Sequence, residues 1–394
     1  MSQLLPVAEA QARLIATAAP VEVEELPITQ ALGRWAAAPL LARRTQPARD
    51  LSAMDGYAVR FRDLPGPLDV IGESAAGAPF AGALGPGEAV RIFTGAAMPA
   101  GADTVMIQEE VDRDGSRATL VGPGPKRLGG NVRRRGLDFA EGDRLVAAGE
   151  RLGAARLAVA ATGGIGHVAV RRRVRVAIAA TGDELVDPGT CTGPDKLPES
   201  NRLLIRAMLA ELPVEIIDLG ILPDRLETLT NAFATMQADL LVTTGGASVG
   251  DHDLVRPALE AAGGTIDFWR IALRPGKPLM AGRLGSAMVL GLPGNPVSAF
   301  VTALLFVKPL VAHLAGAADP FPAPTRALLG EPLPPNDHRT DYLRAELRDG
   351  TAYVASIQDS SMLLTLARAG CLIIRQPHAP AAERGDSAEI LMIA

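Results

Sequence analysis

Three acidic side chains of this sequence, Glu184, Asp224 and Asp253, lie in loops that follow apolar runs. Carboxylates placed in this way are candidate ligands of a hard cation such as Mg²⁺, either directly or through bound water. Acidic residues near helix starts are also common helix caps, and for each one taken alone that alternative stays open. Three acids at successive strand ends favour the metal site.

The same region has three loops in which glycine follows an apolar run, at 181–184, 243–253 and 291–296. Glycines allow backbone N–H groups to approach a phosphate, and each following helix offers the positive end of its dipole. The loops are therefore expected to cradle an anionic ligand together, with a cation between it and the acids. The candidate binding residues are Thr181, Gly182, Gly245, Gly246, Ser248, Gly250, Pro293, Gly294 and Asn295.

Cationic side chains follow nearby in the sequence. Arg270 precedes a turn, Arg274–Pro278, that carries Arg274 and Lys277 among prolines and a glycine. The pattern fits either an anion site or an ordinary surface turn.

Two arginine runs, 133–135 and 171–173 with Arg175, fit either anion patches or solvated faces. The first run is the stronger candidate for an anion patch, because Gly136-Leu137-Asp138 follows it.

Several classes of protein are disfavoured by what the sequence lacks. It has no Walker A pattern, no GxGxxG after an expected strand and no GxSxG elbow, and its histidines are scattered. A formal charge of -5 lacks the basic footprint of a nucleic-acid binder. Two distant cysteines indicate reduced thiols, no apolar run reaches the ~20 residues of a membrane span, and no signal peptide is evident, so we expect a cytoplasmic protein.

The elements that must position these residues fall into distinct stretches of the 394 residues. Residues 3–20 and 28–38 are expected to be helices of a small support. Between residues 48 and 145, short apolar runs are interrupted every 8 to 12 residues by Gly, Pro or Asp, which is typical of a β-rich lobe.

From Val174 onward, apolar runs alternate with helical patterns near 200–212, 226–237 and 254–262, and a long helix is expected from Asn295, with Pro296 at its first position. This βαβ repetition predicts a doubly wound, mostly parallel sheet covered on both faces. After a linker at 316–324, alternating patterns predict a small β-barrel-like domain.

The fold class expected is thus multidomain α/β. We expect an N-terminal helical and linking domain at 1–47 with 146–171, an inserted lobe at 48–145, an α/β domain at 172–318 and a C-terminal β-domain at 322–394.

Seven ordered motifs resemble the molybdopterin molybdenumtransferase family, which includes the MoeA proteins and the gephyrin E domain. They are SAMDGYAVR at 52–60, IFTGAAMPAGAD at 92–103, RRRGLD at 133–138, ATGDEL at 180–185, GGASVGDHD at 245–253, RPGKP at 274–278 and GLPGNPVS at 291–298. Together they span nearly the whole chain.

The resemblance implies a transferase of molybdenum cofactor biosynthesis. Such an enzyme takes adenylated molybdopterin and molybdate, releases AMP with a divalent cation, Mg²⁺, and leaves molybdenum on the dithiolene. It also implies an elongated homodimer whose active site lies between the α/β domain of one subunit and the inserted lobe of the other. Hand-off is implied from a molybdopterin adenylyltransferase and to molybdoenzymes.

Carried over by position, the resemblance assigns functional roles in each domain. Asp55, Thr94 and Asp138 lie on functional positions of the lobe, and Glu184, Asp224 and Asp253 on those of the α/β domain. The cationic positions are Arg270, Arg274 and Lys277. In the C-terminal domain, Arg344 and Ser360 look similar to residues lining the oxyanion site, although the surrounding match is loose.

Two departures from the family pattern concern ligand contacts. Leu51 stands where the family usually has Asn, and Glu199 where Asp often precedes Ser200-Asn201-Arg202. Neither removes a charge from the expected metal site.

Two other hypotheses stay open: a non-catalytic carrier or binding protein for the pterin nucleotide, and a paralogue acting on another nucleotide. The set of acids disfavours the carrier, and the complete lobe and C-terminal domain disfavour the paralogue.

Overall fold

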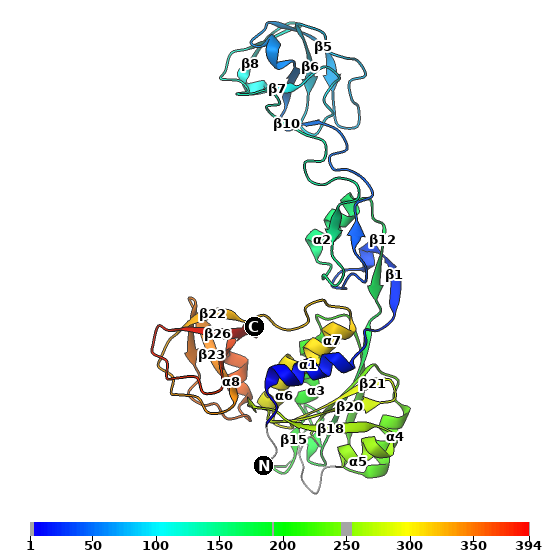
Figure 1. The fold of residues 1–394 in the computed structure, drawn as a ribbon, viewed down its shortest axis with the longest axis vertical. Helices are drawn as coiled ribbons and strands as arrows, with labels where there is room; N and C mark the ends of the chain where they lie inside the picture. Colours follow the sequence, from blue (N-terminus) through cyan, green and yellow to red (C-terminus); the bar gives the residue numbers. More distant parts are fainter. Residues whose placement is uncertain (1–3, 191–192, 246–253, 394) are drawn as a thin grey trace.

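The computed structural model describes residues 4–190, 193–245 and 254–393 of the chain (Figure 1). The molecule is elongated, with the inserted lobe at one end and the α/β and C-terminal domains at the other. A small linking domain joins them. The multidomain α/β fold class is confirmed.

The linking domain is built on antiparallel pairs. β1 (Val23–Pro27) pairs with β12 (His167–Arg171), and β2 (Leu40–Leu41) with β11 (Arg144–Val146), beside α2 (Ala154–Thr162). The helix expected over 28–38 is wrong, because only the 3₁₀ turn η1 (Ile28–Gln30) forms. Gly33 takes a φ of 79°, and Trp35 and Ala36 then form β-bridges to Arg151 and Val170, so tertiary pairing overrides the helical pattern.

The lobe is β-rich, as the fold class predicted. Its sheet has the order β7-β4-β6-β5-β9-β8. These strands are β4 (Gly56–Val59), β5 (Leu68–Ser74), β6 (Glu88–Ile92), β7 (Thr104–Ile107), β8 (Val111–Asp114) and β9 (Arg117–Leu120). The short 3₁₀ turns are η2 (Phe61–Asp63) and η3 (Gln108–Glu110). At its base β3 (Leu51–Ser52) pairs with β10 (Val132–Arg133).

The α/β domain has a six-stranded sheet of order β16-β13-β17-β21-β20-β18. Its strands are β13 (Val174–Thr181), β16 (Val214–Leu222), β17 (Leu240–Thr244), β18 (Thr265–Arg270), β20 (Pro278–Leu284) and β21 (Ala287–Leu292). The first four in this order are parallel. β20 runs in the opposite direction, and β18, which pairs antiparallel with β20, runs in the same direction as the first four. The small pair β14 (Leu185–Val186) and β15 (Leu197–Pro198) lies beside it.

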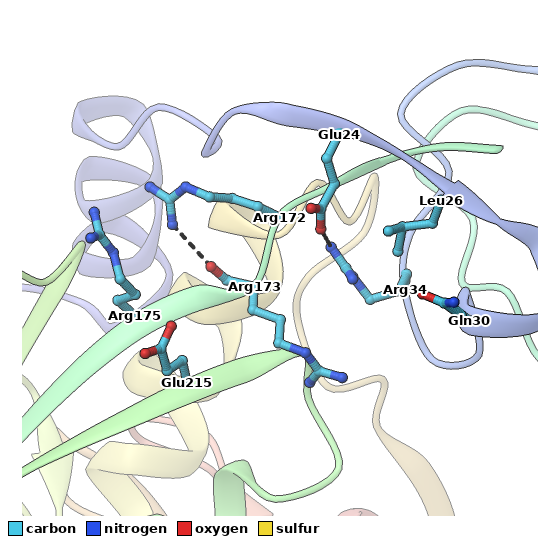
Figure 2. Close-up of a pocket in the computed structure, with 8 residues that line it drawn as sticks. All are labelled: Glu24, Leu26, Gln30, Arg34, Arg172, Arg173, Arg175 and Glu215. Carbon is cyan, nitrogen blue, oxygen red and sulfur yellow. Dashed lines mark hydrogen bonds and ion pairs between the residues drawn. The ribbon is translucent and has the colours of Figure 1, made fainter. Parts of the chain in front are cut away.

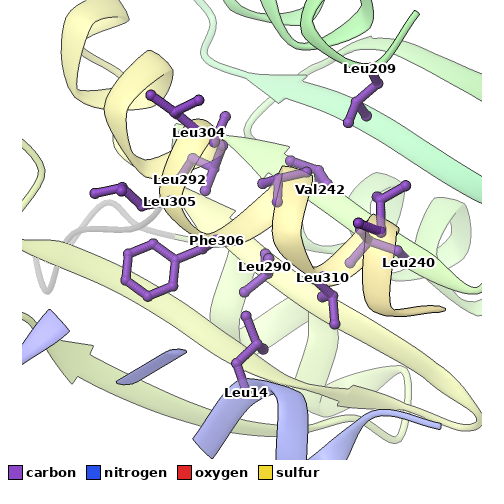
Figure 3. Close-up of a cluster of buried hydrophobic side chains, with 14 of the residues drawn as sticks. Leu14, Leu209, Leu240, Val242, Leu290, Leu292, Leu304, Leu305, Phe306 and Leu310 are labelled. Carbon is purple, nitrogen blue, oxygen red and sulfur yellow. The ribbon is translucent and has the colours of Figure 1, made fainter. Parts of the chain in front are cut away.

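Helices cover both faces of this sheet, because its strands are apolar on both sides. Residues of β13 alternate between two cores: Val176 and Ile178 join one, and Ala177 the other. The first core includes residues of α1 (Val7–Thr17), α3 (Asn201–Leu209) and the long helix formed by α6 (Pro296–Thr302), the π-helical turn η4 (Ala303–Val307) and α7 (Lys308–Leu314) (Figure 3). The second includes residues of α4 (Leu226–Thr235) and α5 (Val255–Ala261).

The long helix is a core element. Its residues Pro296–Leu314 are long and apolar enough to cross a bilayer, but 83% of the apolar window is buried inside the fold. It starts at Pro296 with Asn295 as the preceding cap residue, as the sequence predicts.

The C-terminal domain is a closed barrel of five strands, which confirms the predicted barrel-like domain. β23 (Thr340–Arg348) pairs with both β24 (Thr351–Val354) and β25 (Cys371–Arg375), and β22 (Thr325–Leu329) and β26 (Ser387–Met392) complete the ring. A short helix, α8 (Leu363–Arg368), lies beside it. The two-residue strand β19 (Leu273–Arg274) of the α/β domain pairs in parallel with β23.

Candidate functional site

The three glycine loops of the α/β domain meet at one edge of its sheet. They follow β13, β17 and β21, which are neighbours with parallel register, so their carboxyl ends lie side by side. A Cβ atom on Gly245 would lie 2.6 Å from the backbone oxygen of Thr181, and one on Gly294 would lie 3.8 Å from Cα of Gly245. Thr181, Gly182, Gly245 and Gly294 therefore surround one position.

Acidic side chains gather at the same edge. The backbone N–H of Asp224 donates to Oδ1 of Asp183 at 3.2 Å. Burial raises the pKa of Asp224 above its ordinary value, and the negative charges of Asp183 and Glu184 raise it further. Glu184 folds back over Gly182, since a Cβ there would lie 2.7 Å from its carboxylate oxygens. Asp183, next to Glu184 in the same loop, belongs to this group although only its neighbour was a sequence candidate.

A bound cation would relieve the repulsion among these carboxylates. In the described ranges, no group of three or more His, Cys, Asp or Glu side chains is placed so that it could hold a metal ion. The third candidate ligand, Asp253, lies outside the described residues, as do the loop candidates Gly246, Ser248 and Gly250. The described acids thus fit part of a cation site.

The expected cations lie at the end of β18, which is Arg270, and on the turn that leads to β20, which carries Arg274 and Lys277. Arg270, Arg274 and Lys277 are exposed there. Gly276 holds the turn close to α6, since a Cβ at this position would lie 2.7 Å from Cγ2 of Thr302. Within the described chain, the side chains of Arg270 and Lys277 have no recorded ion pair or hydrogen bond, which leaves them available to an anion.

Arg274 is held by the C-terminal domain. Its guanidinium donates to the carboxylate of Asp341 and lies 3.5 Å from Asp337. The hydrogen bond and charge of Asp341, with the charge of Asp337, raise the pKa of Arg274. Asp341 is only 3% exposed and its Oδ1 has no hydrogen-bond partner. No local signal in the sequence connects Asp341 with Arg274, because their contact depends on the pairing of β19 with β23.

The same domain contacts the third glycine loop. The side-chain amide of Asn295 donates to Oγ of Ser360 at 3.1 Å, and the N–H of Val297 donates to the Ser360 carbonyl. Arg344 is 1% exposed and donates to the carbonyls of Ile357 and Met362, so it supports the segment that carries Ser360. Burial lowers the pKa of Arg344. Pro293, which belongs to this loop, is buried.

The candidates of the inserted lobe form a separate group. Both the N–H and the hydroxyl of Thr94 donate to Oδ1 of Asp55, at 2.7 and 2.8 Å. The hydrogen bond from the Thr94 backbone lowers the pKa of Asp55 most, and the bond from the Thr94 hydroxyl and the nearby charge of Arg91 lower it further. Asp55 therefore stays ionised. Asp138 is exposed at the base of the lobe. Within one chain the linking domain separates this group from the α/β site (Figure 1).

Glu199, one of the two departures, has a structural role in this fold. Its side chain is 3% exposed and accepts hydrogen bonds from the N–H and Nε of Arg202 in the first turn of α3. Its carboxylate is thus occupied by the helix start. Leu51 pairs with Arg133 in the β3–β10 ribbon.

Comparisons with known proteins cover almost the whole chain. Residues 5–164 match the model of the MoeA N-terminal region (domains I and II), and residues 177–313 match a probable molybdopterin binding domain. Residues 326–393 match the MoeA C-terminal region (domain IV).

Individual relatives agree with these models. The chain is 41% identical to the molybdopterin molybdenumtransferase of Haemophilus influenzae, over 75% of this chain and 74% of that protein. It is 31% identical to that of Bacillus subtilis over 99% and 94% of the two chains. Two crystal structures of a molybdopterin biosynthesis MoeA protein from Pyrococcus horikoshii have TM-scores of 0.80 and 0.85 at 30% and 26% identity, over 99% of this chain and 99% and 100% of theirs.

The close approach at Gly245 generates a stability prediction. Gly245→Ala should destabilise the protein by about 1–3 kcal/mol more than Gly189→Ala, since its new methyl group must displace the Thr181 backbone. Gly189 is the matched control because both glycines have a φ of 86° but nothing lies within 4 Å of a Cβ on Gly189. Urea unfolding of both variants measures the difference. Equal loss in the two variants would contradict the packed arrangement of the loops.

Proposed function

This chain belongs to the molybdopterin molybdenumtransferase family, and on that premise we propose that it transfers molybdenum from molybdate to adenylated molybdopterin with release of AMP. The observation that carries the proposal is that the glycine loops and the acids meet at one edge of the sheet, and that the RPGKP turn between β18 and β20 lies along the same edge. Backbone N–H groups and helix starts suit a pyrophosphate, and fixed cations suit a tetrahedral oxyanion.

We propose that the required divalent cation is Mg²⁺, held by Glu184, Asp224 and Asp253, with Asp183 close by. The raised pKa of Asp224 supports this, because carboxylates that repel one another are stabilised by a cation. When bound, such an ion neutralises charge on the phosphoanhydride oxygens. The chain itself orients the pyrophosphate through Thr181, Gly182, Gly245 and the neighbouring loop residues Gly246, Ser248 and Gly250.

Molybdate is proposed to bind beside the RPGKP turn. Arg270, Arg274 and Lys277 supply positive charge there, and Ser360 and Asn295 supply polar groups from the adjoining loops. Arg344 acts through the segment that it supports, while Pro293 and Gly294 shape the floor. Asp341 acts as a positioning residue, since it fixes the direction of the Arg274 guanidinium.

The complete site is proposed to need two chains. Asp55, Thr94 and Asp138 are distant from the α/β site within one chain, and the elongated shape allows the lobe of a partner to reach it in a homodimer (Figure 1). The ionised Asp55 would face the substrate from that side. We further propose a cytoplasmic protein that receives adenylated molybdopterin from an adenylyltransferase and passes the cofactor to molybdoenzymes.

The first test is AMP release from adenylated molybdopterin by the purified protein with Mg²⁺, with and without molybdate. We predict release that depends on both. Tight binding of the nucleotide with no release in the presence of both would refute the transferase and favour a carrier.

For Asp224→Asn we predict opposite effects on activity and stability. AMP release should fall at least ~100-fold, because a metal-directed charge is lost. Without a divalent cation, the thermal midpoint of this variant should be equal to or higher than that of the wild type. The pKa of Asp224 is raised in the folded protein, so ionisation of this side chain destabilises the fold as pH rises through that pKa. Asn carries no charge and removes this effect.

Asp349→Asn, on the exposed β23–β24 turn, is the control for this variant and should change neither quantity. Wild-type AMP release by Asp224→Asn would remove Asp224 from the cation site.

For Asp341→Asn we predict a raised KM for molybdate with a smaller change in kcat, because Arg274 loses its buried charged partner but keeps its own charge. Steady-state rates of AMP release at varied molybdate concentration measure the changes in KM and kcat separately. Asp337→Asn, which removes the weaker 3.5 Å contact, should show a smaller rise. An equal fall of kcat in both variants at unchanged KM would contradict the positioning role.

A further inference from the structure

A second cationic site lies at the opposite end of the α/β sheet. The arginine run 171–173 with Arg175 enters the start of β13, whereas Thr181 at its other end belongs to the candidate active site. Arg175 and Thr181 are six positions apart along the strand, a distance of roughly 20 Å. The run borders a pocket of about 540 Å³ between the linking domain and the sheet (Figure 2). It is lined by Glu24, Leu26, Gln30, Arg34, Arg172, Arg173, Arg175 and Glu215.

Two of the four arginines in the pocket are neutralised by partners. Arg172 makes paired hydrogen bonds to both carboxylate oxygens of Asp239 and a further one to Glu22. Arg34 contacts Glu24 at 2.6 Å. These pairs hold two cations in place at the edges of the pocket.

The other two arginines have unused charge. Arg173 is exposed, and no ion pair or hydrogen bond of its side chain is recorded within the described chain. Arg175 reaches Asp239 only at 3.8 Å, and that carboxylate already binds Arg172. Against them the lining has one carboxylate without a recorded partner, Glu215. The lining itself therefore carries four guanidinium groups against two carboxylates, while Glu22 and Asp239 balance the charge from outside it.

Unsatisfied donors also border this pocket. The Nε atoms of Arg34 and Arg175 are buried and have no hydrogen-bond partner. Arg34 is only 4% exposed, so its orientation is set by the fold. Buried donors without partners are costly. Because both Nε atoms are shielded, the accessible cationic groups of the pocket are the exposed side chain of Arg173 and that of Arg175, which is 38% exposed.

We propose that this pocket binds a small, multiply charged oxyanion of the phosphate or pyrophosphate class. Guanidinium groups match such oxygens well, and the lining has no aromatic side chain on which a nucleotide base would stack. The bound anion contacts Arg173 and Arg175 of the α/β domain, next to Arg34 of the linking domain, at the junction with the arm that carries the inserted lobe. The site is separate from the proposed transferase site and does not depend on its activity.

The test is calorimetric titration of the full chain with pyrophosphate, and separately with inorganic phosphate, at constant ionic strength and with a chelator to exclude divalent cations. We expect binding that is weakened at least ~10-fold in Arg173→Ala/Arg175→Ala, because two charge-assisted contacts are lost. Arg326→Ala removes an exposed arginine on β22 of the C-terminal barrel and should bind as wild type does.

A further variant separates the two anion sites. Lys277→Ala affects the candidate active site and should leave pyrophosphate binding in this pocket unchanged. The ligand should also raise the thermal midpoint of the wild type and of Lys277→Ala by clearly more than that of the double variant. No measurable binding by the wild type, or equal binding by the double variant, would overturn the proposal. A loss seen only in Lys277→Ala would place the anion at the strand ends instead.

Discussion

The parallel pairing of β13 with β17 and of β17 with β21 is the constraint on which the site depends. Parallel strands end at the same edge, so the loops after Thr181, Thr244 and Leu292 must meet there. Both faces of such a sheet must be covered, and the two separate cores around β13 show how this is achieved. The backbone hydrogen bonds that hold the sheet together thus also bring the candidate binding residues of the three loops close to one another.

The C-terminal barrel completes this edge from outside. It contacts the RPGKP turn through the β19–β23 pairing and Asp341, and the third glycine loop through Ser360. Within the barrel, β23 is held by backbone pairing with three strands, β19, β24 and β25. A barrel remote in sequence therefore sets the direction of Arg274.

Patterns of local origin were predictable. Apolar periodicity identified α3, α4 and α5, and the Asn-Pro signal identified the start of the long helix at Pro296. The order of strands with glycine at their ends was enough to place Thr181, Gly245 and Gly294 together. The antiparallel addition of β20 was not separately expected, and residues 28–38 were expected to form a helix, since β-bridges from distant segments determine their conformation.

Contacts between domains were beyond local signals. The sequence around Asp341 shows only an acidic residue at the start of a strand, and nothing in it predicts the contact with Arg274. Asp183 was not predicted as a site residue, because the candidate in that loop was its neighbour Glu184. The position of Asp55 and Thr94 far from the α/β loops also depends on the path of the linking domain. The departure at Glu199 is understood only from the structure, where the longer side chain reaches Arg202.

Uncompensated polar groups occur at both ends of β13. At the sheet edge beside its carboxyl end, burial and two neighbouring carboxylates push Asp224 toward its neutral form. At its amino end, guanidinium donors remain unused. Elsewhere the strand is buried among apolar side chains. Unfavourable local arrangements such as these persist when the surrounding fold holds the residues in place. A ligand that relieves the unfavourable arrangement binds more tightly for that reason. Carboxylates in excess favour a cation at one end, and guanidinium groups in excess favour an anion at the other, so a single strand separates two sites of opposite charge preference.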